Sequence, residues 1–446
     1  MISIIVAVSL SATPIRLEEA REQARGNTRA LQAEIDRRRA GEAVNLARAP
    51  LLPQVNLSAT FGGVVAGPQR FFATRPVVDP ETREITGYVQ EPVDVPGATR
   101  GLFDLNVGIN QLLFDAGRWA QLRQAGAQAE AAQGQAYEEQ LTSELEAVRR
   151  FYALHRAERT RKVLEERVRG SQSLFERSAA LYEAGKRRKE DAISAQVNLG
   201  NDRIQSILQR SAIVTAETDL GTWLLRPTSE RLETVEPSEL AAAPRPVPTL
   251  DQALAAAREN RPLLSALAAQ VRASEEAIAV AQAGWLPTVS ANITYGRSAP
   301  QPGPFFTDLT RQNAVSGGIG LNWNLFGGFA TRAQEDDARL VRDRAQLALG
   351  QAERDVAGDV RKALEALAAQ VEAADVARAN REVAREGLLL AEERFAAGLS
   401  TTLEVRDAQL KVTNAELVQL ESRIDVEIAR AALERAMGTL SRGALK

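Results

Sequence analysis

Hydrophobic and polar residues alternate in two matching segments of the chain. One covers residues 47–62 and the other residues 281–296, and the two align without a gap. Each contains Leu-Pro, then alternating apolar and polar residues, and each ends on an aromatic residue followed by glycine. Alternation with a period of two predicts a β-strand that has one apolar and one polar face. The matching pair predicts an internal repeat.

Two further segments, near residues 104–110 and 318–325, alternate in the same way. The polar positions of these strands carry mostly small and amide side chains. Such a face suits the wet interior of a membrane barrel whose other face meets lipid, although an ordinary half-buried antiparallel sheet also alternates. Aromatic residues near the strand ends, which would suit a membrane interface, are Phe61, Phe114, Trp285, Tyr295, Trp323 and Phe326.

The segments outside the strands are rich in Ala, Glu, Arg, Gln and Leu, as in long coiled-coil helices. No proline interrupts the run from Phe114 to about Tyr182, and Gly185 and Gly398 are expected to end the two longest helices. Helices this long and polar need partner helices to be stable. Apolar residues seven apart, which make the narrow stripe of a coiled coil, are Leu403, Leu410, Leu417, Ile424 and Ala431.

The two copies of the pattern predict the organisation of the chain. Residues 1–13 are interpreted as the remnant of a secretory signal, because Ile2–Leu10 is apolar and small residues follow; a short strand or a helix start is the alternative. Each repeat is expected to contain a helix, two strands around a Pro/Gly-rich exposed loop, a long helix, a tip and a shorter helix. The first repeat is expected at 14–223, with a helix at 17–48, strands at about 53–66 and 102–113, a loop at 62–101 and a tip at 183–190. A proline-rich connector is expected at 224–249. The second repeat is expected at 250–440, with a helix at 250–284, strands at about 287–297 and 314–325, a loop at 297–313 and a tip at 396–402, followed by a tail at 441–446.

Composition removes several functional classes. The chain has no Cys, which excludes disulfides, thiolate metal sites and cysteine nucleophiles. Its single histidine, His155, leaves no histidine-based metal cluster or Ser-His-Asp triad and is expected to be structural. The formal net charge of -3 gives no sign of nucleic-acid binding. Without a nucleophile–base pair or a phosphate-binding glycine loop, we expect no enzyme, no metal and no cofactor.

Membrane geometry predicts how many copies assemble. No segment reaches the ~18–20 apolar residues of a transmembrane helix, so a place in a membrane requires a closed barrel. Four strands cannot close one, because the smallest outer-membrane barrels have about eight. Two copies would supply about eight strands, whose interior side chains fill, whereas three copies would supply about twelve. We therefore expect a mainly α-helical protein with a small β part, in which long helical coiled-coil hairpins form a tunnel and four antiparallel strands per chain complete a 12-strand barrel in a homotrimer.

The ordered set of motifs resembles the outer-membrane efflux (TolC-like) channel family, from about residue 15 to residue 440. Both tips carry an aromatic residue, a glycine three residues later, an acidic residue six further on, and then Ala-Gln. The segments that carry the resemblance are the Leu-Pro strand starts at Pro53 and Pro287, the strand-to-helix turns Leu113–Arg118 and Leu325–Gly328, and the tips Leu181–Gln196 and Arg394–Gln409.

The resemblance implies a homotrimeric duct with a β-barrel in the lipid of the bacterial outer membrane and a helical tunnel through the periplasm. It also implies that the tips close the tunnel and dock a periplasmic adaptor protein and an inner-membrane transporter. A type I protein-secretion exit duct is the alternative within the family, and a soluble coiled-coil scaffold is the more distant one. The residues so assigned to gate and docking are Tyr182, Gly185, Lys186, Arg187, Arg188, Phe395, Gly398, Leu399 and Ser400.

Three carboxylates are candidates for a constriction, namely Asp191, Glu404 and Asp407. Glu404 and Asp407 are three residues apart and share one helix face. In a trimer they would form stacked acidic rings that favour cations, and the resemblance matches them to an acidic constriction. The alternative is a solvated helix start, where acids are favoured anyway.

Two positions depart from the family pattern. Phe395 stands where the family often has Tyr, and Ser400 stands where some members carry a basic residue. Basic charge is concentrated instead on the first tip, in residues 186–189. This run is expected either to contact Asp191, Glu404 or an acidic adaptor surface, or to be a solvated face.

Overall fold

The computed structural model describes residues 12–241, 245–299, 301–307 and 313–440. The chain divides into two compact units, and each unit takes segments from both repeats. The helical unit contains residues 1–42, 126–273 and 341–446, and the sheet unit contains residues 43–125 and 274–340. Most of the predicted signal remnant and the whole predicted tail lie outside the described residues.

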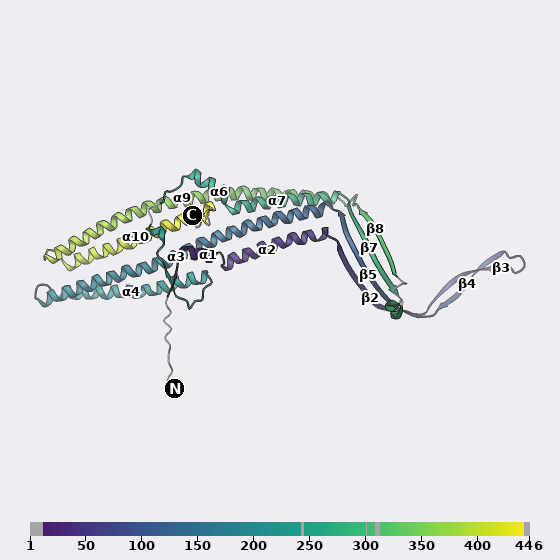
Figure 1. Ribbon diagram of the computed structural model, residues 1–446, viewed down its shortest axis with the longest axis horizontal. Coiled ribbons are helices and arrows are strands. Elements are labelled where there is room, and N and C mark those ends of the chain that lie inside the picture. Colours follow the sequence, from purple (N-terminus) through teal and green to yellow (C-terminus); the bar gives the residue numbers. More distant parts are fainter. Residues whose placement is uncertain (1–11, 242–244, 300, 308–312, 441–446) are drawn as a thin grey trace, which may run out of the picture. The chain divides into compact units, whose positions relative to one another are not determined.

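Helices make up most of the described chain (Figure 1). The two longest, α3 (Ala116–Glu183) and α9 (Ala330–Ala396), have 68 and 67 residues, about 100 Å each at ~1.5 Å per residue. Within the described residues, no helix combines the length and the apolar character needed to cross a membrane. The remaining helices are α1 (Leu17–Ala24), α2 (Thr28–Arg48), α4 (Lys189–Trp223), α5 (Ser238–Ala241), α6 (Leu250–Asn260), α7 (Pro262–Gln282), α8 (Pro302–Thr307) and α10 (Thr402–Met437), with single 3-10 turns η1 (Ala49–Leu51) and η2 (Ala283–Trp285).

Two expected helices are each interrupted. The helix expected over 17–48 is broken into α1 and α2 around Gly26, and the side chain of Asn27 accepts a hydrogen bond from the Ala30 N–H at 2.8 Å, which starts α2 anew. The helix expected over 250–284 is broken before Pro262, which has no N–H to continue α6. Thr249 caps α6 in a reciprocal pair with Gln252.

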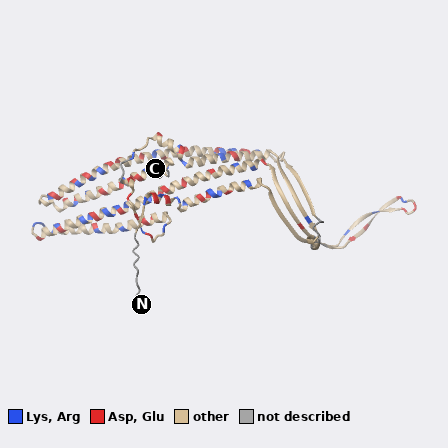
Figure 2. Cartoon of the chain, viewed as in Figure 1, with Lys and Arg blue, Asp and Glu red and all other residues tan. Residues whose placement is uncertain are grey.

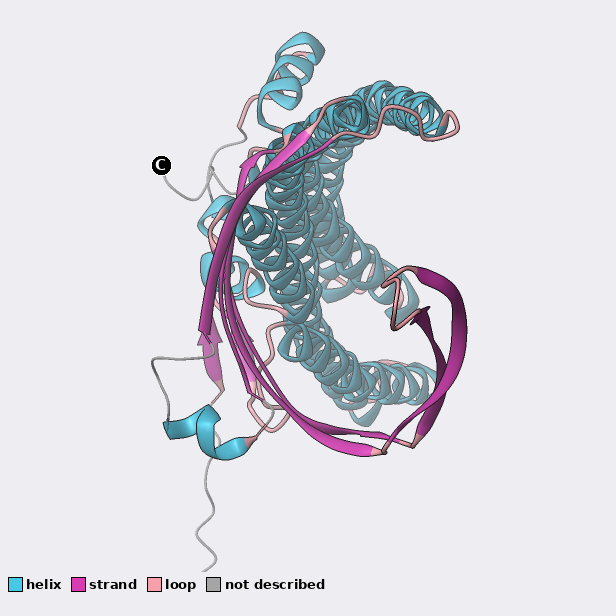
Figure 3. Ribbon diagram, turned by 90° about the vertical axis from the view of Figure 1, so that its right-hand side faces the viewer, coloured by secondary structure: helices cyan, strands magenta, loops and turns pink. Residues whose placement is uncertain are grey.

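One antiparallel sheet of four strands runs through the sheet unit. Its strands are β2 (Gln54–Ala66), β5 (Ala98–Phe114), β7 (Thr288–Ala299) and β8 (Asn313–Asn322), in the order β2-β5-β7-β8. Figure 3 shows them in magenta as one curved layer. The strand expected to reach residue 325 ends at Asn322, because its partner begins at Thr288 and the preceding Pro287 has no N–H to donate. The strand expected over 102–113 is longer, because its start pairs with residues up to Ala66.

The register puts most apolar strand residues on one face; Leu102 and Leu112, which pair with Gly62 and Ser290, lie on the other. Leu57 faces Val107, Val107 faces Tyr295, and Tyr295 faces Val315, so one apolar row crosses the sheet. The next row joins Val55, Ile109 and Ile293. The opposite face carries Asn56, Ser58, Thr60, Asp104, Asn106, Asn110, Asn292, Thr294, Ser316 and Asn322. The predicted amphipathic strands are therefore confirmed, with one apolar and one small, polar face.

The exposed loop expected over 62–101 is wrong in its central part. This stretch forms a second, two-stranded antiparallel sheet of β3 (Gln69–Val78) and β4 (Ile85–Val95). Its residues are rich in β-branched and aromatic side chains, which favour extended pairing over an irregular loop. In the same way, the loop expected over 297–313 contains the short helix α8.

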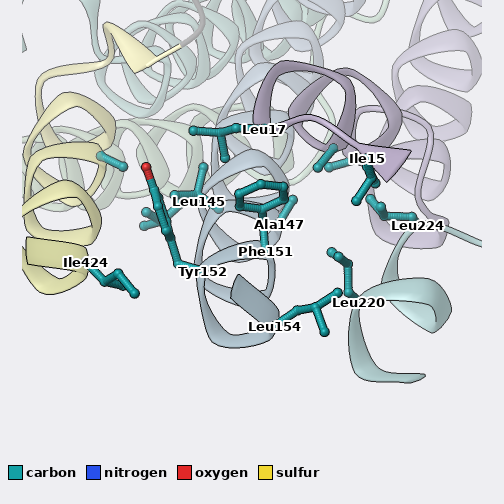
Figure 4. Packing of buried hydrophobic residues seen from close by; sticks show 14 of the residues in the cluster. Ile15, Leu17, Leu145, Ala147, Phe151, Tyr152, Leu154, Leu220, Leu224 and Ile424 are labelled. Carbon is teal, nitrogen blue, oxygen red and sulfur yellow. The ribbon is translucent and has the colours of Figure 1, made fainter. Parts of the chain in front are cut away.

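The main hydrophobic core lies in the helical unit. It joins β1 (Thr13–Ile15), α1, α3, α4 and α10 around the fully buried side chains of Phe151, Tyr152 and Leu154 (Figure 4). Within the predicted connector, β6 (Leu232–Thr234) pairs in parallel with β1 and closes this core. A second core packs α6 and α10 on Val360, Leu364 and Leu367 of α9. Leu403, the first residue of the expected coiled-coil stripe, is 75% exposed.

Candidate functional site

The two hairpin tips have the same backbone geometry. Gly185 and Gly398 both take positive φ, of 68° and 76°. In each tip the glycine N–H bonds the carbonyl three residues back, and the next N–H bonds the carbonyl five residues back, at 2.9 Å for Lys186 and 2.8 Å for Leu399. This is the Schellman motif, which ends a helix with a left-handed residue that glycine adopts without strain. The repeat therefore extends to the hydrogen bonds of the tips.

Arg187 of the first tip connects the two tips. Its guanidinium donates to the carbonyl oxygen of Ser400 at 2.8 Å and lies over the ring of Phe395, 5.1 Å from the ring centroid. Phe395 is buried against Leu174 and Val405. Of the expected partners of the basic run, neither Asp191 nor Glu404 pairs with Arg187 in the described structure. The contact instead uses a backbone oxygen and an aromatic face.

The predicted acidic residues lie in three different environments. Asp191 accepts a hydrogen bond from the Thr402 hydroxyl at 2.9 Å, which makes a second link between the tips. Glu404 is exposed, and its N–H bonds the Thr401 side chain at the start of α10. Asp407 forms an ion pair with Lys411 at 2.7 Å on the exposed side of the same helix. Glu404 and Asp407 thus share a solvated face that is opposite to the buried side chain of Val405.

The other predicted tip residues differ in exposure. Tyr182 is 42% exposed and Leu399 is 72% exposed, while Lys186 and Arg188 are also exposed. Ser400 is buried, with its carbonyl occupied by Arg187. Leu399 and Tyr182 therefore remain accessible to a partner, whereas Phe395 and Ser400 hold the tips together.

A buried charge cluster that sequence reasoning missed lies inside the helical hairpins. Arg406 is four residues from the start of α10, and Asp202 is 13 residues from the start of α4. Arg406 of α10 makes two hydrogen bonds to the carboxylate of Asp202 in α4, at 2.7 and 2.8 Å. Arg167 of α3 pairs with the same carboxylate at 2.5 Å, and the Ser171 hydroxyl also donates to it. Asp202 is 1% exposed and Arg406 is 6% exposed. We call these four residues the Asp202 cluster; it joins both hairpins.

The ionisation of Asp202 reflects opposing effects. Burial raises its pKa, but hydrogen bonds from Arg406, Ser171 and Arg167 outweigh burial and lower the pKa below its ordinary value. The carboxylate is therefore charged at neutral pH, with cations on two sides. A bidentate Arg–carboxylate pair is directional, so the cluster fixes the register between α4 and α10.

The apolar face of the four-stranded sheet is the second candidate surface. Leu57, Ile293 and Ile319 are 69%, 56% and 75% exposed, and Figure 2 shows few charged residues along these strands. We call this surface the apolar sheet face. Its exposed apolar side chains lie in continuous rows across the four strands, and such patches mark protein or membrane contacts.

The predicted aromatic residues lie mostly toward the ends of this sheet. Phe61 lies at one end and contacts Phe103 and Phe305, with ring centroids 5.9 Å away in both cases. At the other end, the Trp323 indole N–H donates to the carbonyl of Trp285 at 3.0 Å; Phe114 is the last residue of β5, and Phe326 follows β8. Tyr295 is the exception, because it lies within β7, in the row of Leu57 and Val107.

Sequence reasoning could have found only part of what it missed. Phe103 continues the alternation of β5 and faces Phe61, so its period-two position was a usable signal. Asp202 and Arg406 carry no local signal, because each is one more charged residue in a charged helix. Within the described residues there is no group of His, Cys, Asp and Glu side chains that could hold a metal ion.

The sequence of the chain is similar to those of known outer-membrane proteins. A family model described as "Outer membrane efflux protein" matches residues 20–224 and 253–439. The chain is 29% identical over 210 residues to the outer membrane efflux protein BepC of Brucella suis, which is 45% of this chain and 44% of that protein. The chain thus matches less than half the length of this curated relative.

Two solved channels illustrate the structural likeness. The MtrE outer membrane channel of Neisseria gonorrhoeae, in an open state, is 18% identical with a TM-score of 0.75, covering 95% of this chain and 89% of that one. The CmeC outer membrane channel of Campylobacter jejuni is 15% identical with a TM-score of 0.73, covering 95% and 86%. At these identities the likeness establishes a shared fold.

Proposed function

Since the chain belongs to the outer membrane efflux protein family, we propose that it is a homotrimeric channel that acts as the exit duct of a tripartite efflux system. Membership of this family assigns it to the outer membrane, with its helices in the periplasm. The observation that carries the proposal is the apolar sheet face together with the two edges of that sheet. On a single copy, the apolar sheet face is unfavourable in water, and the unpaired edges are unfavourable in lipid.

The edges require other copies of the chain. The sheet order β2-β5-β7-β8 leaves β2 and β8 each paired on one side only within the described residues. Unpaired N–H and C=O groups in hydrocarbon are very unfavourable, so a sheet in lipid must close. Pairing β8 of one copy with β2 of the next closes a ring, and three copies supply about twelve strands, within the range of such barrels.

The height of the apolar sheet face suits a membrane. Two apolar rows mark its upper and lower limits. One row contains Phe61, Phe103 and Ala299, and the other contains Val289. Along β7 these rows are ten residues apart (299 − 289 = 10). At ~3.3 Å per residue this is about 33 Å along the strand. A strand tilt of about 40° reduces it to roughly 25 Å along the barrel axis, which is the height of the apolar band in outer-membrane barrels.

Exposed apolar stripes on two helices support the same ring. α4 has Ile193, Val197 and Ile204 on its outside, all 50% exposed or more. α9 exposes Val376, Val383 and Leu390, which are seven residues apart. Seven-residue spacing on a helix surface is typical of a coiled-coil seam. We therefore propose that α4 of one copy packs against α9 of the next, a head-to-tail contact that a ring can close.

The tips complete the proposal. The exposed residues Tyr182, Lys186, Arg188, Lys189 and Leu399 offer a docking surface for a periplasmic adaptor, which would connect the channel to an inner-membrane transporter. Glu404 and Asp407, on one solvated face of α10, are proposed to line the constriction, with Asp191 beside them. Rings of carboxylates at a narrow point favour cations over anions.

The experiment measures assembly and conductance of the same purified protein. In detergent we expect native mass spectrometry to give a trimer, and planar bilayers to give cation-selective conductance. The double variant Glu404→Lys with Asp407→Lys should reduce cation selectivity, while Glu353→Lys, on an exposed part of α9 away from the proposed contact between copies, should leave it unchanged. A monomer that stays folded and soluble without detergent would refute the channel, and unchanged selectivity in the double variant would remove these two residues from the constriction.

A further inference from the structure

An arginine-rich pocket lies in the helical unit, between elements that are far apart in the sequence. Its wall comes from the start of α2, the middle of α3 and the ends of α4 and α10, and its volume is about 430 Å³. This volume is within the range of roughly 300–1,000 Å³ in which small-molecule sites fall. We call it the arginine pocket. The charged residues that line it are Arg29, Glu146, Arg149, Arg150 and Arg435.

The lining of the arginine pocket has four arginines and only one carboxylate. That carboxylate, Glu146, forms an ion pair with Arg150 at 2.9 Å. Arg29 and Arg149 form no ion pair with any described residue of the chain, and both side chains are exposed to the pocket. The pocket therefore keeps a positive charge after its own ion pair is counted.

The fourth arginine shows that cations crowd one another here. Arg435 lies 2.9 Å from the carboxylate of Glu138, but this carboxylate also pairs with Arg261. Burial, followed by the charge of Arg261, lowers the pKa of Arg435. Arg149 also lowers it, while Glu138 and Asp359 act in the opposite direction. A guanidinium stays charged at neutral pH, so a bound anion would relieve this crowding.

Trp223 holds two of the guanidinium groups without neutralising them. Its ring centroid lies 4.8 Å from the guanidinium carbon of Arg150 and 5.6 Å from that of Arg29. The indole N–H donates to the carbonyl of Ser143 at 3.3 Å, which fixes the ring against α3. A cation–π contact orients an arginine but does not use its N–H donors. Arg29 is therefore held in place by an aromatic face and not by a carboxylate.

The arginine pocket lies on the side of α3 opposite to α1. Glu144 is two residues from Glu146, which is about 200° around the helix, and its buried carboxylate pairs with Arg25 at the end of α1 at 2.7 Å. Together with β1, α1 packs into the main core on that side. In a tunnel made of the long helices, these short elements must lie outside the wall, because they would otherwise fill the passage. In the proposed channel, the arginine pocket then faces the lumen.

The carboxylates of the tips are too far away to neutralise the pocket. Arg149 is 34 residues from the end of α3 (183 − 149 = 34), or about 50 Å along the helix at ~1.5 Å per residue. This distance is several times the Debye length of about 8 Å at physiological ionic strength. The proposed acidic constriction and the arginine pocket therefore act on ions independently.

We propose that the arginine pocket is a binding site, in the wall of the tunnel, for small anions that carry two or more negative charges, such as phosphates and polycarboxylates. Arg29 and Arg149 supply the uncompensated charges, and their planar guanidinium groups match the paired oxygens of a phosphate or carboxylate. The place of the site in the lumen rests on the proposed channel. Binding itself does not, because every lining residue belongs to the helical unit of a single chain.

Binding is measured by calorimetry on the purified full-length chain in detergent, at constant ionic strength. The probes are pyrophosphate and citrate, which carry several negative charges, acetate, which carries one, and glycerol, which carries none. Pyrophosphate and citrate should bind saturably with a Kd at or below about 1 mM, whereas acetate and glycerol should not bind. If neither multivalent anion binds, the proposal is overturned, whether or not the protein conducts in bilayers.

Variants test which arginines hold the anion. Arg29→Ala and Arg149→Ala should each weaken binding at least about tenfold, as expected when a hydrogen bond to a charged group is lost, and Arg149→Lys should recover part of the affinity. The control is Arg169→Ala, 20 residues further along α3 (169 − 149 = 20), where the arginine pairs with Glu166; it should leave binding unchanged. Circular dichroism and trimer content check the folding of each variant. Equal weakening by Arg169→Ala and Arg149→Ala would show a general effect of charge and overturn the site.

Single-channel currents test whether the site faces the lumen. Citrate added on one side of a planar bilayer should reduce the current of the unmodified channel saturably. The double variant Arg29→Ala with Arg149→Ala should lose this reduction. Binding in detergent without any effect of citrate on the current would overturn the place of the site in the tunnel. If no channel forms, the proposed function fails, and calorimetry still decides whether the arginine pocket binds anions.

Discussion

The apolar sheet face and the helical hairpins differ in which residues they expose and which they bury. On the sheet, Leu57 and Ile319 are exposed and apolar, and few charges occur on either face. In the hairpins, charged residues cover the helix surfaces (Figure 2), and the buried Asp202 cluster is ionic. One chain therefore combines an exposed apolar surface on its sheet with a buried ionic cluster between its helices.

This contrast shows that burial in a single copy does not identify the environment of a residue. Lipid has no hydrogen-bonding groups, so a lipid-facing strand residue must be apolar even where nothing in its own chain covers it. Between helices that are polar along most of their length, a directional ion pair can select one packing register. The following predictions test each side of this contrast, from the largest expected effect to the smallest.

Removal of Asp202 should have the largest effect on stability. Asp202→Ala leaves Arg406 buried without its carboxylate, which should lower the free energy of unfolding by about 3–5 kcal/mol. Chemical denaturation in detergent measures this loss. The control is Asp219→Ala on the exposed side of α4, with an expected change within about 0.5 kcal/mol.

A double-mutant cycle with Arg406→Ala separates the interaction from the loss of each side chain. If Asp202 and Arg406 act together, the double variant should be more stable than the sum of the two single losses predicts. Strictly additive losses would contradict a coupled cluster.

A charge on the apolar sheet face should be the next most damaging change. Ile293→Arg puts a guanidinium on the face assigned to lipid, and should destabilise the folded barrel by about 2–4 kcal/mol. Asn292→Arg, one residue earlier, puts the same charge on the polar face and should be tolerated. Heat-modifiable migration on gels and folding yield into lipid vesicles compare the two variants. Equal damage from both would count against a lipid-facing surface.

The link between the tips should contribute less. Arg187→Ala removes one hydrogen bond to Ser400 and the cation–π contact with Phe395, which together should amount to about 1–2 kcal/mol. Lys186→Ala, a neighbouring exposed cation, is the control. Because Arg187 joins the tips, its loss should also raise the mean open time of single channels in bilayers. Unchanged gating in a folded Arg187→Ala variant would restrict this residue to a structural role.

The dependence of stability on pH should give the smallest and most gradual effect. The folded-state pKa of Asp202 lies below its ordinary value of 3.8, so the unfolded chain takes up protons first as the pH falls. The stabilisation is fully present above that value and is lost as the pH falls through the folded-state pKa. Unfolding midpoints should therefore decline less steeply with acid in Asp202→Ala than in the unmodified chain. Parallel curves would show that Asp202 does not contribute.

Sequence patterns by themselves determined the elements that repeat. The alternation of Val55, Leu57 and Phe61, with its copy at Val289, Ala291 and Tyr295, predicted two strands, and the alternation near residues 104–110 and 318–325 predicted two more. Their apolar face could be predicted as well, because side-chain direction in a strand has a strict period of two. The positions of Gly185 and Gly398 predicted the ends of the long helices, since positive φ is a local property of the backbone. Family membership followed from the order of these motifs.

Only the tertiary structure decided which charged residues are buried and paired. Asp202 and Arg406 are 204 residues apart, and His155 and Thr234 are 79 residues apart, so no local pattern relates them. In helices whose surfaces are charged throughout, the sequence period does not distinguish a solvated carboxylate from one held between two arginines. Packing of α3, α4 and α10 makes that distinction, because charge becomes structural only where neighbouring helices exclude water from it.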